Sequence, residues 1–397
     1  MKSSASACEE LPGRGVPPVR KGPQGHSRGR GTHWFPMVLS MVFLFGCGGG
    51  EGSGNPGGDR ESGAAAGEMQ LEVSPDSIGT TALLQAVSPV DRSVVWVSGH
   101  AGTYARSTDG GEHWQVSVMQ GAGDLQFRDV EAFDSLSAVL MSAGPGGLSR
   151  IYRTSDGGRS WDLQYRAQDP GAFLDCLAFW DSDHGLAYGD SVDEFPFILR
   201  TMDGGERWAR VPPSGLPQAL EGEGGFAASG TCLVTGEGGR AWVATGAGPR
   251  PRVLMTEDWG ESWRAIEVPV VGGGSSGLTT LQVGPDGWGI ALGGTIGEDT
   301  LRTQNVAVTE DGGRSWQEAN APAMTGPIYG SALVDLGRGY GVVAVGPMGL
   351  DWAVRPGLQW READSLSYWA VAFADSTAGW AVGPEGRLAR LAFREAR

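Results

Sequence analysis

The sequence contains few of the residues from which metal and redox centres are built. It has four cysteines and five histidines in 397 residues, with no CxxC pair, no Cys/His cluster and no CxxCH motif. Those absences argue against a zinc site, a haem and a copper centre. The sequence also has no GxGxxG between a strand and a helix, which argues against a dinucleotide site. We therefore expect no metal and no cofactor.

Positive charge is scarce beyond the first 47 residues. The chain has 30 Lys and Arg against 46 Asp and Glu, and six of the basic residues but only two of the acidic ones precede residue 48. The remaining part thus has a net charge of about −20. Nucleic acids and anionic lipid surfaces bind basic protein surfaces, so neither is expected to be the main partner.

The apolar run of the N-terminal leader is too short to span a bilayer. It covers residues 34–45, follows six basic residues and ends in the sequence Leu44-Phe45-Gly46-Cys47. A run of about 12 residues suits the core of a signal peptide. The L-x-G-C ending resembles a bacterial lipobox, which implies an extracytoplasmic protein that is anchored to the membrane by a lipid on Cys47. An uncleaved anchor and an ordinary secretory signal are the alternatives.

Residues 48–68 consist mainly of Gly, Ser, Ala and acidic residues. They have too little apolar surface to fold, so we expect a flexible tether. The predicted organisation is therefore a signal peptide at residues 1–47, a tether at residues 48–68 and a folded domain at residues 69–397.

The folded part is organised by a repeated eight-residue phrase, [S/T]-x-D-x-G-x-x-W. The Asp carboxylate can accept backbone N–H groups in a tight turn, the Gly allows a positive φ, and the Trp can bury a large ring beside the turn. We therefore interpret the phrase as a structural turn. Its clear copies contain Asp109 and Trp114, Asp156 and Trp161, Asp203 and Trp208, Asp258 and Trp263, and Asp311 and Trp316. A sixth copy, at residues 353–360, has Arg355 in place of the Asp.

The spacing of the phrase indicates the fold. Successive tryptophans of the six copies are 47, 47, 55, 53 and 44 residues apart, which suits one four-stranded antiparallel unit per repeat. Repeats of paired helices can have similar periods. Here, however, apolar and polar residues alternate with a period of two in the intervening stretches, which are also rich in Gly and β-branched residues. We therefore predict strands.

Aligning the copies predicts seven such units. The seventh ends with its third strand, at residues 387–393, and residues 70–74 can supply its missing outer strand. The sequence thus predicts an all-β fold, a single seven-bladed β-propeller that is closed by an N-terminal strand and has no open edge. The expected first strands of the units are at residues 83–87, 127–133, 173–179, 226–233, 278–283, 328–334 and 368–373.

The repeated phrase resembles the Asp boxes of bacterial neuraminidase repeats. The single seven-unit ring, over residues 70–397, resembles the propellers of the photosystem II stability/assembly factor-like family. Residues 173–181 (FLDCLAFWD), 184–193 (HGLAYGDSVD), 221–231 (EGEGGFAASGT) and 242–246 (WVATG) resemble a non-photosynthetic bacterial branch of it. Members of that branch are loosely described as oxidoreductases or glycosyl hydrolases. The resemblance implies the fold and a secreted setting, and it implies no particular reaction.

The resemblance also separates structural from functional residues. In such propellers the box lies in the turn between the third and outer strands, on the face opposite the usual ligand site, so its Asp residues are expected to be structural. By alignment, Asp181, Asp183 and His184 also lie in an ordinary turn on that far face. We interpret them as turn residues rather than metal ligands.

Loops at the other face provide the candidate ligand site. Three interpretations of these loops are possible: an acidic rim that is only solvated, a cation or polyol site, or a docking surface for a basic partner. A hydrolytic carboxylate pair is a further possibility. The candidate residues are Arg128, Asp129, Asp175, Asp190, Asp193, Glu194, Glu221 and Glu223.

Known enzyme classes match the chain poorly. Sialidases need an Arg triad, an F-R-I-P-like phrase and a Tyr/Glu nucleophile, and no such phrase occurs here. Xyloglucanase-like enzymes use two propellers.

Cys176 and Cys232 lie in apolar stretches and could form a disulfide, but we expect buried free thiols. The predicted function is a monomeric, non-enzymatic binding or assembly scaffold for a protein or carbohydrate ligand, with a glycoside hydrolase as the alternative and an oxidoreductase as a weaker one.

Overall fold

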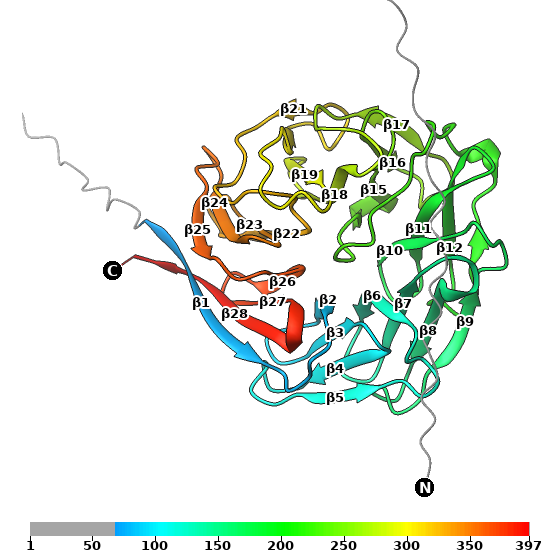
Figure 1. The fold of residues 1–397 in the computed structure, drawn as a ribbon, viewed down its shortest axis with the longest axis horizontal. Coiled ribbons are helices and arrows are strands. Elements are labelled where there is room, and N and C mark those ends of the chain that lie inside the picture. The colour runs from blue at the N-terminus through cyan, green and yellow to red at the C-terminus, as the bar shows by residue number, and fades with distance from the viewer. Residues whose placement is uncertain (1–67, 397) are drawn as a thin grey trace, which may run out of the picture. The chain divides into compact units, whose positions relative to one another are not determined.

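The computed structural model describes residues 68–396, which form seven four-stranded antiparallel sheets arranged as a ring (Figure 1). The seven-bladed all-β propeller predicted from the repeats is confirmed. No helix in this part of the chain is long and apolar enough to cross a membrane. The predicted signal peptide, Cys47 and the tether lie outside the described residues, apart from Glu68.

Each blade has four strands, and in blades 1 to 6 these follow one another in the chain from the channel outward. Blade 1 contains β2 (Leu84–Pro89), β3 (Val95–Gly99), β4 (Thr103–Ser107) and β5 (Gln115–Val118). Blade 2 contains β6 (Gln126–Ala132), β7 (Ala138–Ala143), β8 (Arg150–Thr154) and β9 (Asp162–Arg166). Blade 3 contains β10 (Leu174–Phe179), β11 (Gly185–Val192), β12 (Phe195–Thr201) and β13 (Ala209–Arg210). Blade 4 contains β14 (Leu233–Gly236), β15 (Arg240–Ala244), β16 (Arg252–Thr256) and β17 (Arg264–Glu267).

The remaining blades complete the ring. Blade 5 contains β18 (Ser276–Val283), β19 (Gly289–Thr295), β20 (Val306–Thr309) and β21 (Gln317–Glu318). Blade 6 contains β22 (Gly330–Asp335), β23 (Tyr340–Gly346), β24 (Gly349–Val354) and β25 (Arg361–Asp364). Blade 7 contains β26 (Ala370–Asp375), β27 (Ala378–Val382) and β28 (Arg387–Glu395) with β1 (Met69–Ser77). Short 3₁₀ turns are η1 (Gly146–Leu148), η2 (Pro213–Gly215), η3 (Glu237–Gly239) and η4 (Pro384–Gly386).

The N-terminal strand closes the ring. β1 pairs with β28 along its whole length, from Met69 opposite Glu395 to Ser77 opposite Arg387. Leu71 and Val73 of β1 pack against the apolar cluster of blades 6 and 7. The predicted closing strand is therefore confirmed, and it covers the edge that β28 would otherwise expose.

Neighbouring blades are held together by apolar faces and by tryptophans. Because alternate residues of a strand point to opposite faces, each blade can present one apolar face to each neighbour. Between blades 2 and 3, for example, Met141 and Ile151 pack in one cluster with Leu177. In addition, the indole N–H of Trp242 in blade 4 donates to the carbonyl of Gly312 in blade 5, at 2.9 Å.

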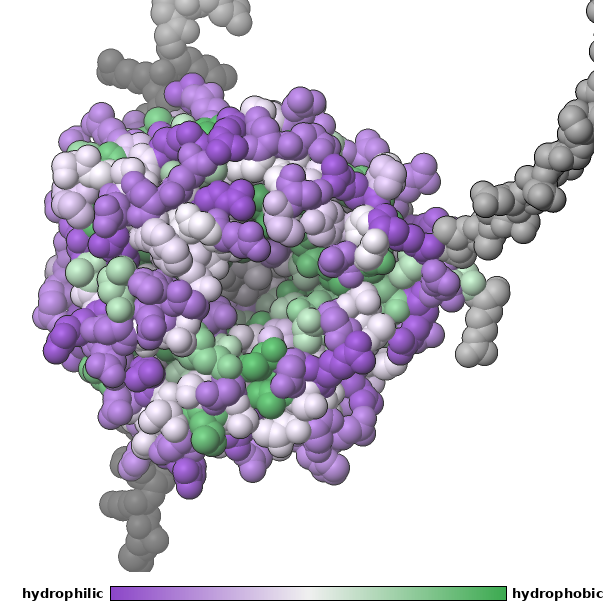
Figure 2. All heavy atoms as spheres, turned by 180° about the vertical axis from the view of Figure 1, so that it is seen from behind, coloured by the Kyte–Doolittle hydropathy of each residue, from purple (hydrophilic) through white to green (hydrophobic). Residues whose placement is uncertain are grey.

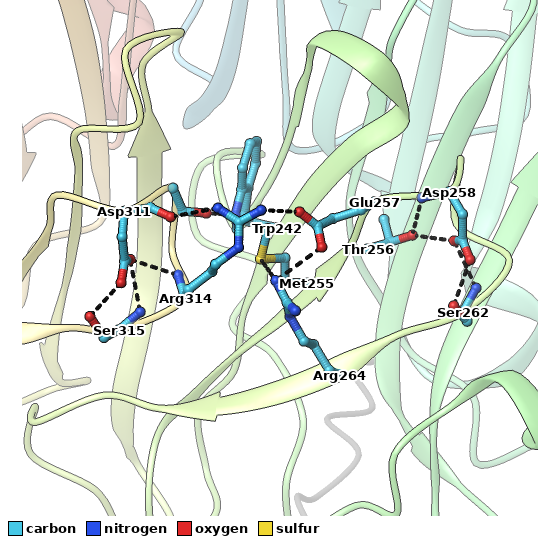
Figure 3. Close-up of polar contacts among 11 residues, drawn as sticks. Trp242, Met255, Thr256, Glu257, Asp258, Ser262, Arg264, Asp311, Arg314 and Ser315 are labelled. Carbon is cyan, nitrogen blue, oxygen red and sulfur yellow. Dashed lines mark hydrogen bonds and ion pairs between the residues drawn. The ribbon is translucent and has the colours of Figure 1, made fainter.

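The five clear copies of the repeated phrase form the same turn. In Figure 3, the Thr256 hydroxyl donates to Asp258 Oδ1 at 2.8 Å, and the same oxygen accepts the Ser262 N–H at 2.9 Å. The Gly260 N–H donates to Thr256 Oγ1 at 3.1 Å. The other four copies have the equivalent bonds. Backbone N–H donation by His113 and by Ser160 lowers the pKa of Asp109 and Asp156, respectively, to about 2.

Ion pairs connect these turns around the ring. Glu257, beside the turn of blade 4, binds Arg314 of the next turn at 2.5 Å and Arg264 of its own blade at 3.2 Å (Figure 3). In the sixth copy, Arg355 replaces the turn-forming Asp and reaches back to blade 5. It pairs with Asp286 at 2.7 Å and with Glu310 at 2.9 Å.

Two features of blade 4 differ from prediction. The first strand was expected at residues 226–233, but β14 begins at Leu233, and the residues before it run outside the sheet. The other six first strands lie within two residues of their predicted limits. The expectation of free thiols was wrong, because Cys176 of β10 and Cys232, just before β14, form a disulfide with a Cα–Cα distance of 6.0 Å. The two apolar stretches meet in the folded chain although 56 residues separate them.

Candidate functional site

The irregular segment at residues 222–231, here called the cap, contacts blades on opposite sides of the ring. The Gly225 N–H donates to Asp190 of blade 3 at 3.0 Å, and the carbonyl of Ala227 accepts from Arg128 of blade 2 at 2.8 Å. On the other side, Ser229 donates to the Tyr329 carbonyl, just before blade 6, at 2.7 Å. The cap therefore crosses one end of the channel.

Glycine and small residues let the cap lie directly on buried acidic groups. A Cβ on Gly225 would be 2.4 Å from Asp175 Oδ2, and one on Gly230 would be 2.3 Å from Asp129 Oδ1. These two contacts leave no room for a side chain. A segment that is rich in glycine and other small residues has little apolar side-chain surface to bury in a strand. This explains why residues 226–232 do not form the predicted first strand.

Three of the predicted ligand-face residues lie beneath the cap. Asp175 is 1% exposed, and burial together with the nearby charge of Asp190 raises the pKa of its carboxyl well above the ordinary range. Burial also raises the pKa of Asp190. Arg128, the nearest cation, is held by the cap carbonyl of Ala227 and by Gln126. The structure places these residues at one end of the channel, where the cap covers them.

Glu223 was expected on an acidic rim, and the structure corrects this expectation. Its side chain is buried in an ion pair with Arg252, whose Nε lies 2.8 Å from Oε1. Thr245 also donates to Oε1, at 2.9 Å, and the Leu220 N–H donates to Oε2 at 2.9 Å. All of these bonds lie within the protein, so Glu223 supports the cap rather than presenting a free charge.

Asp193, Glu194 and Glu221 are exposed on the cap side. Asp193 and Glu194 form a tight turn with φ values of +55° and +67°, and Asp193 lies 3.9 Å from Arg210. Glu194 and Glu221 border a surface hollow of about 470 Å³. Of the acidic candidates, these three are fully exposed, whereas Asp190 is partly buried.

The space that remains in the channel lies beyond the cap. A pocket of about 330 Å³ lies between the inner strands, with Ser229, Gly230 and Thr231 of the cap in its wall. It leads to a second hollow, because Glu131 and Phe179 border both. We call the first space the channel pocket, and we call the residues at its mouth the collar. The collar consists of the large apolar residues of this mouth, Pro89, Val90, Phe133, Phe179 and Trp180, and Glu131, Ala132, Asp181 and Ser182 border the same hollow. Figure 2 shows the ring hollowed at its centre, with hydrophobic residues beside the hollow.

Two carboxyl groups from one strand, β6, line the channel pocket. Asp129 is 4% exposed and accepts the N–H groups of Val130 at 2.8 Å and of Leu177 at 2.7 Å, so it bridges β6 and β10. Glu131 is partly exposed, and burial raises its pKa to about 7. Within residues 68–396 the side chain of Glu131 makes no hydrogen bond or ion pair. Glu131 was not among the predicted site residues, although its position two residues after Asp129 on a strand places both on one face.

The described residues contain no group of three or more His, Cys, Asp or Glu that could hold a metal ion. Asp181 Oδ1 accepts the N–H groups of Asp183 and His184, both at 2.8 Å, in the turn between the first two strands of blade 3. The turns formed by the repeated phrase, here called the box turns, pack on these inner turns, as in the bond from the Gly204 N–H to the Asp183 carbonyl at 2.8 Å. The collar and the box turns therefore lie at the same end of the ring.

Comparisons with known proteins agree with this fold. No model of a protein family matches the chain. A relative described as photosystem II assembly lipoprotein Ycf48, from Synechococcus sp. (strain CC9902), is 28% identical over 222 residues, which are 56% of this chain and 57% of the relative. The chain thus matches little more than half the length of that relative.

Solved structures give the same result at lower identity. A structure described as YCF48 bound to D1 peptide matches with a TM-score of 0.60 and 18% identity, over 81% of this chain and 96% of the other. YCF48 from Cyanidioschyzon merolae matches with a TM-score of 0.57 and 15% identity, over 80% and 99% of the two chains. The GH74 xyloglucanase from Xanthomonas campestris has a TM-score of 0.56 and 17% identity, over 81% of this chain and 55% of the enzyme. The predicted resemblance to photosystem II assembly factor-like propellers is confirmed.

Proposed function

We propose that the protein is a non-enzymatic scaffold that binds a segment of another protein at the ends of its channel. The arrangement of the carboxyl groups carries this proposal. Asp175, Asp190 and Glu223 are covered or paired, and the two carboxyls of the channel pocket come from a single strand. A propeller that is similar in fold is described as bound to a peptide, which is consistent with such a role.

A glycoside hydrolase is the competing function. Such enzymes need two carboxyl groups on either side of the bond that is cleaved. Glu194 and Glu221 come from different segments and border one hollow, but both are exposed to solvent. The similar xyloglucanase is about twice as long as the matched region, so this chain corresponds to roughly half of that enzyme. These observations favour binding over hydrolysis.

We further propose that the scaffold acts outside the cytoplasmic membrane and is attached to it by a lipid on Cys47. The lipobox-like sequence before Cys47 supports this location, as does the description of the relative as a lipoprotein. The disulfide between Cys176 and Cys232 suits an oxidising compartment. Replacing Cys47 with Ser should release the protein from the membrane fraction or leave its precursor unprocessed. Normal processing with membrane retention would contradict the anchor.

Site-specific photo-crosslinking in the source cell tests the scaffold proposal. A photoreactive residue replaces Val90 in the collar or Glu221 on the cap side, and Leu163, which is 50% exposed on an outer strand, serves as the control. We expect a discrete protein adduct from at least one end of the channel and none from position 163. No adduct, or equal adducts from all three positions, would refute the scaffold. Glycan hydrolysis by the purified protein that is lost in Glu194→Gln or Glu221→Gln would establish the hydrolase instead.

A further inference from the structure

We propose that the channel pocket receives one lysine or arginine side chain from the bound protein segment, with Glu131 as its ion-pairing group. This inference rests on the proposed function and specifies the chemistry of the partner. Three independent observations carry it: the shape of the pocket, the unpaired carboxyl group within it and the apolar collar at its mouth.

The shape of the channel pocket suits the end of a side chain. Its volume of about 330 Å³ corresponds to on the order of ten water molecules, which exceeds the volume of a lysine or arginine side chain. Residues 229–231 of the cap form part of its wall, and further cap contacts cross the channel. A polypeptide therefore cannot pass through the ring. It can lie across the collar and insert a side chain.

The charge in the channel pocket selects a cation. Asp129 and Glu131 are the charged residues among those that line it, and the lining of the described chain contains no Lys or Arg. Both oxygens of Asp129 already accept backbone N–H groups. Glu131 has no such partner, and an unpaired carboxylate in a confined site is costly. An inserted ammonium or guanidinium group would supply the missing partner.

The collar distinguishes a basic side chain from a small cation. Phe133 and Phe179 pack edge to face with their ring centroids 5.0 Å apart, and Pro89 and Trp180 lie beside them, while Asp181 and Ser182 border the same hollow. Lysine and arginine carry their charge on an aliphatic stem that packs well on such surfaces. A bare metal ion or a fully hydrated cation would gain nothing from the collar.

Binding of short blocked peptides tests the inference. The probes are acetyl-Gly-Lys-Gly-amide, its arginine analogue and a norleucine analogue that keeps the stem without the charge. We expect the two basic peptides to bind at least tenfold more tightly than the norleucine peptide. The Glu131→Gln variant should lose this preference, Glu131→Asp should keep part of it, and Glu318→Gln, which removes one exposed charge on the outer strand β21, should keep all of it. Thermal melting of each variant establishes that it is folded.

The pH dependence gives a second readout. Because burial raises the pKa of Glu131 to about 7, the affinity for the lysine peptide should fall on the order of tenfold between pH 8 and pH 6 in the wild type. The other titratable groups near Glu131 are Asp129 on β6 and Asp181 beside the collar. The strands β2, β10, β14, β18 and β26 contribute no charged side chain to the pocket lining. The dependence should therefore disappear in Glu131→Gln.

Several outcomes would overturn the inference. Equal binding of the lysine and norleucine peptides would exclude a cation site, and unchanged lysine binding by Glu131→Gln would exclude Glu131. If 1,5-diaminopentane bound as tightly as the lysine peptide, the occupant would be a free polyamine rather than a protein segment. Suppose that the partner adduct persists unchanged in Glu131→Gln and that the wild type shows no preference for basic peptides. This result would refute only this inference and would still support the scaffold function. Loss of every adduct would refute the scaffold itself.

Discussion

The two ends of the channel are built from the same repeat, yet only one of them is open. At the cap end, a glycine-rich segment covers Asp175 and Asp190 and is supported by the pair of Glu223 and Arg252. At the collar end, the side chain of Glu131 has no hydrogen-bond or ion-pair partner among the described residues and borders the collar. Buried carboxyl groups at the first end therefore contribute to structure, whereas the carboxyl group at the second is available to a ligand.

The largest expected effect is at the cap end and concerns Glu223. Replacing it with Gln should leave Arg252 buried without a charged partner and lower the free energy of unfolding by about 3 to 5 kcal/mol. Glu221→Gln, two residues away but exposed, should change it by less than about 0.5 kcal/mol. Urea unfolding monitored by tryptophan fluorescence compares the two variants. Equal stability would mean that the pair does not hold the cap.

The disulfide joins blade 3 to Cys232, the residue that directly follows the cap, and its removal is the next largest change. Because it closes a loop of 56 residues, the double variant Cys176→Ala, Cys232→Ala should lose about 3 to 4 kcal/mol through the greater entropy of the unfolded chain. Mass spectrometry of the wild type under non-reducing conditions measures the bond directly. Two free thiols, or a variant as stable as the wild type, would contradict its structural role.

At the collar end, removing a charge should stabilise the protein. The pKa of Glu131 is about 7 in the folded protein and near 4.5 in the unfolded chain, so between these values the folded state binds more protons. The stability of the wild type should therefore fall as the pH rises from about 4.5 to about 7 and level off above that range. Glu131→Gln should be more stable than the wild type by about 3 kcal/mol at pH 8, and this advantage should vanish below pH 4.5. Melting temperatures from pH 4 to pH 8 test the sign, and a destabilised variant at pH 8 would contradict it.

The smallest effect is expected in the repeated turns at the collar end. Asp258→Ala removes the acceptor of the Ser262 N–H and should cost about 1 to 2 kcal/mol. Asp258→Asn keeps an acceptor oxygen and should cost less. Binding of the lysine peptide by the folded protein should be unchanged in both, because the turn lies outside the channel pocket. Weaker binding would mean that the box turns belong to the ligand site.

The sequence predicted most of the fold because its information is local and repeated. Each turn uses residues within eight positions of one another, as in the bonds among Thr256, Asp258 and Ser262. The spacing of these turns then predicts the number of strands and blades. Even the closing pair of β1 and β28 followed from the count, because one blade lacked an outer strand.

The candidate site was predicted less well because its contacts are not local. Arg128, Asp175 and Asp190 lie near one end of the channel, and strand order determines which loops meet there. Their exposure was not predictable, because it depends on where residues 222–231 run after leaving blade 3. Glu131 was missed because its local sequence shows only that it lies on a strand. Whether an inward-facing strand residue has an ion-pair partner depends on distant residues, so nothing in the sequence indicated that Glu131 has none.

The sequence by itself thus determined the seven-bladed ring, its closure by the N-terminal strand and the structural turns, because hydrogen bonds and strand pairings between nearby residues specify them. Only the tertiary structure decided that Cys176 meets Cys232, that the cap closes one end of the channel and that Glu131 faces an open pocket at the other. Those features depend on contacts across the ring, where the path of an irregular segment decides which polar groups lose water and which remain unpaired.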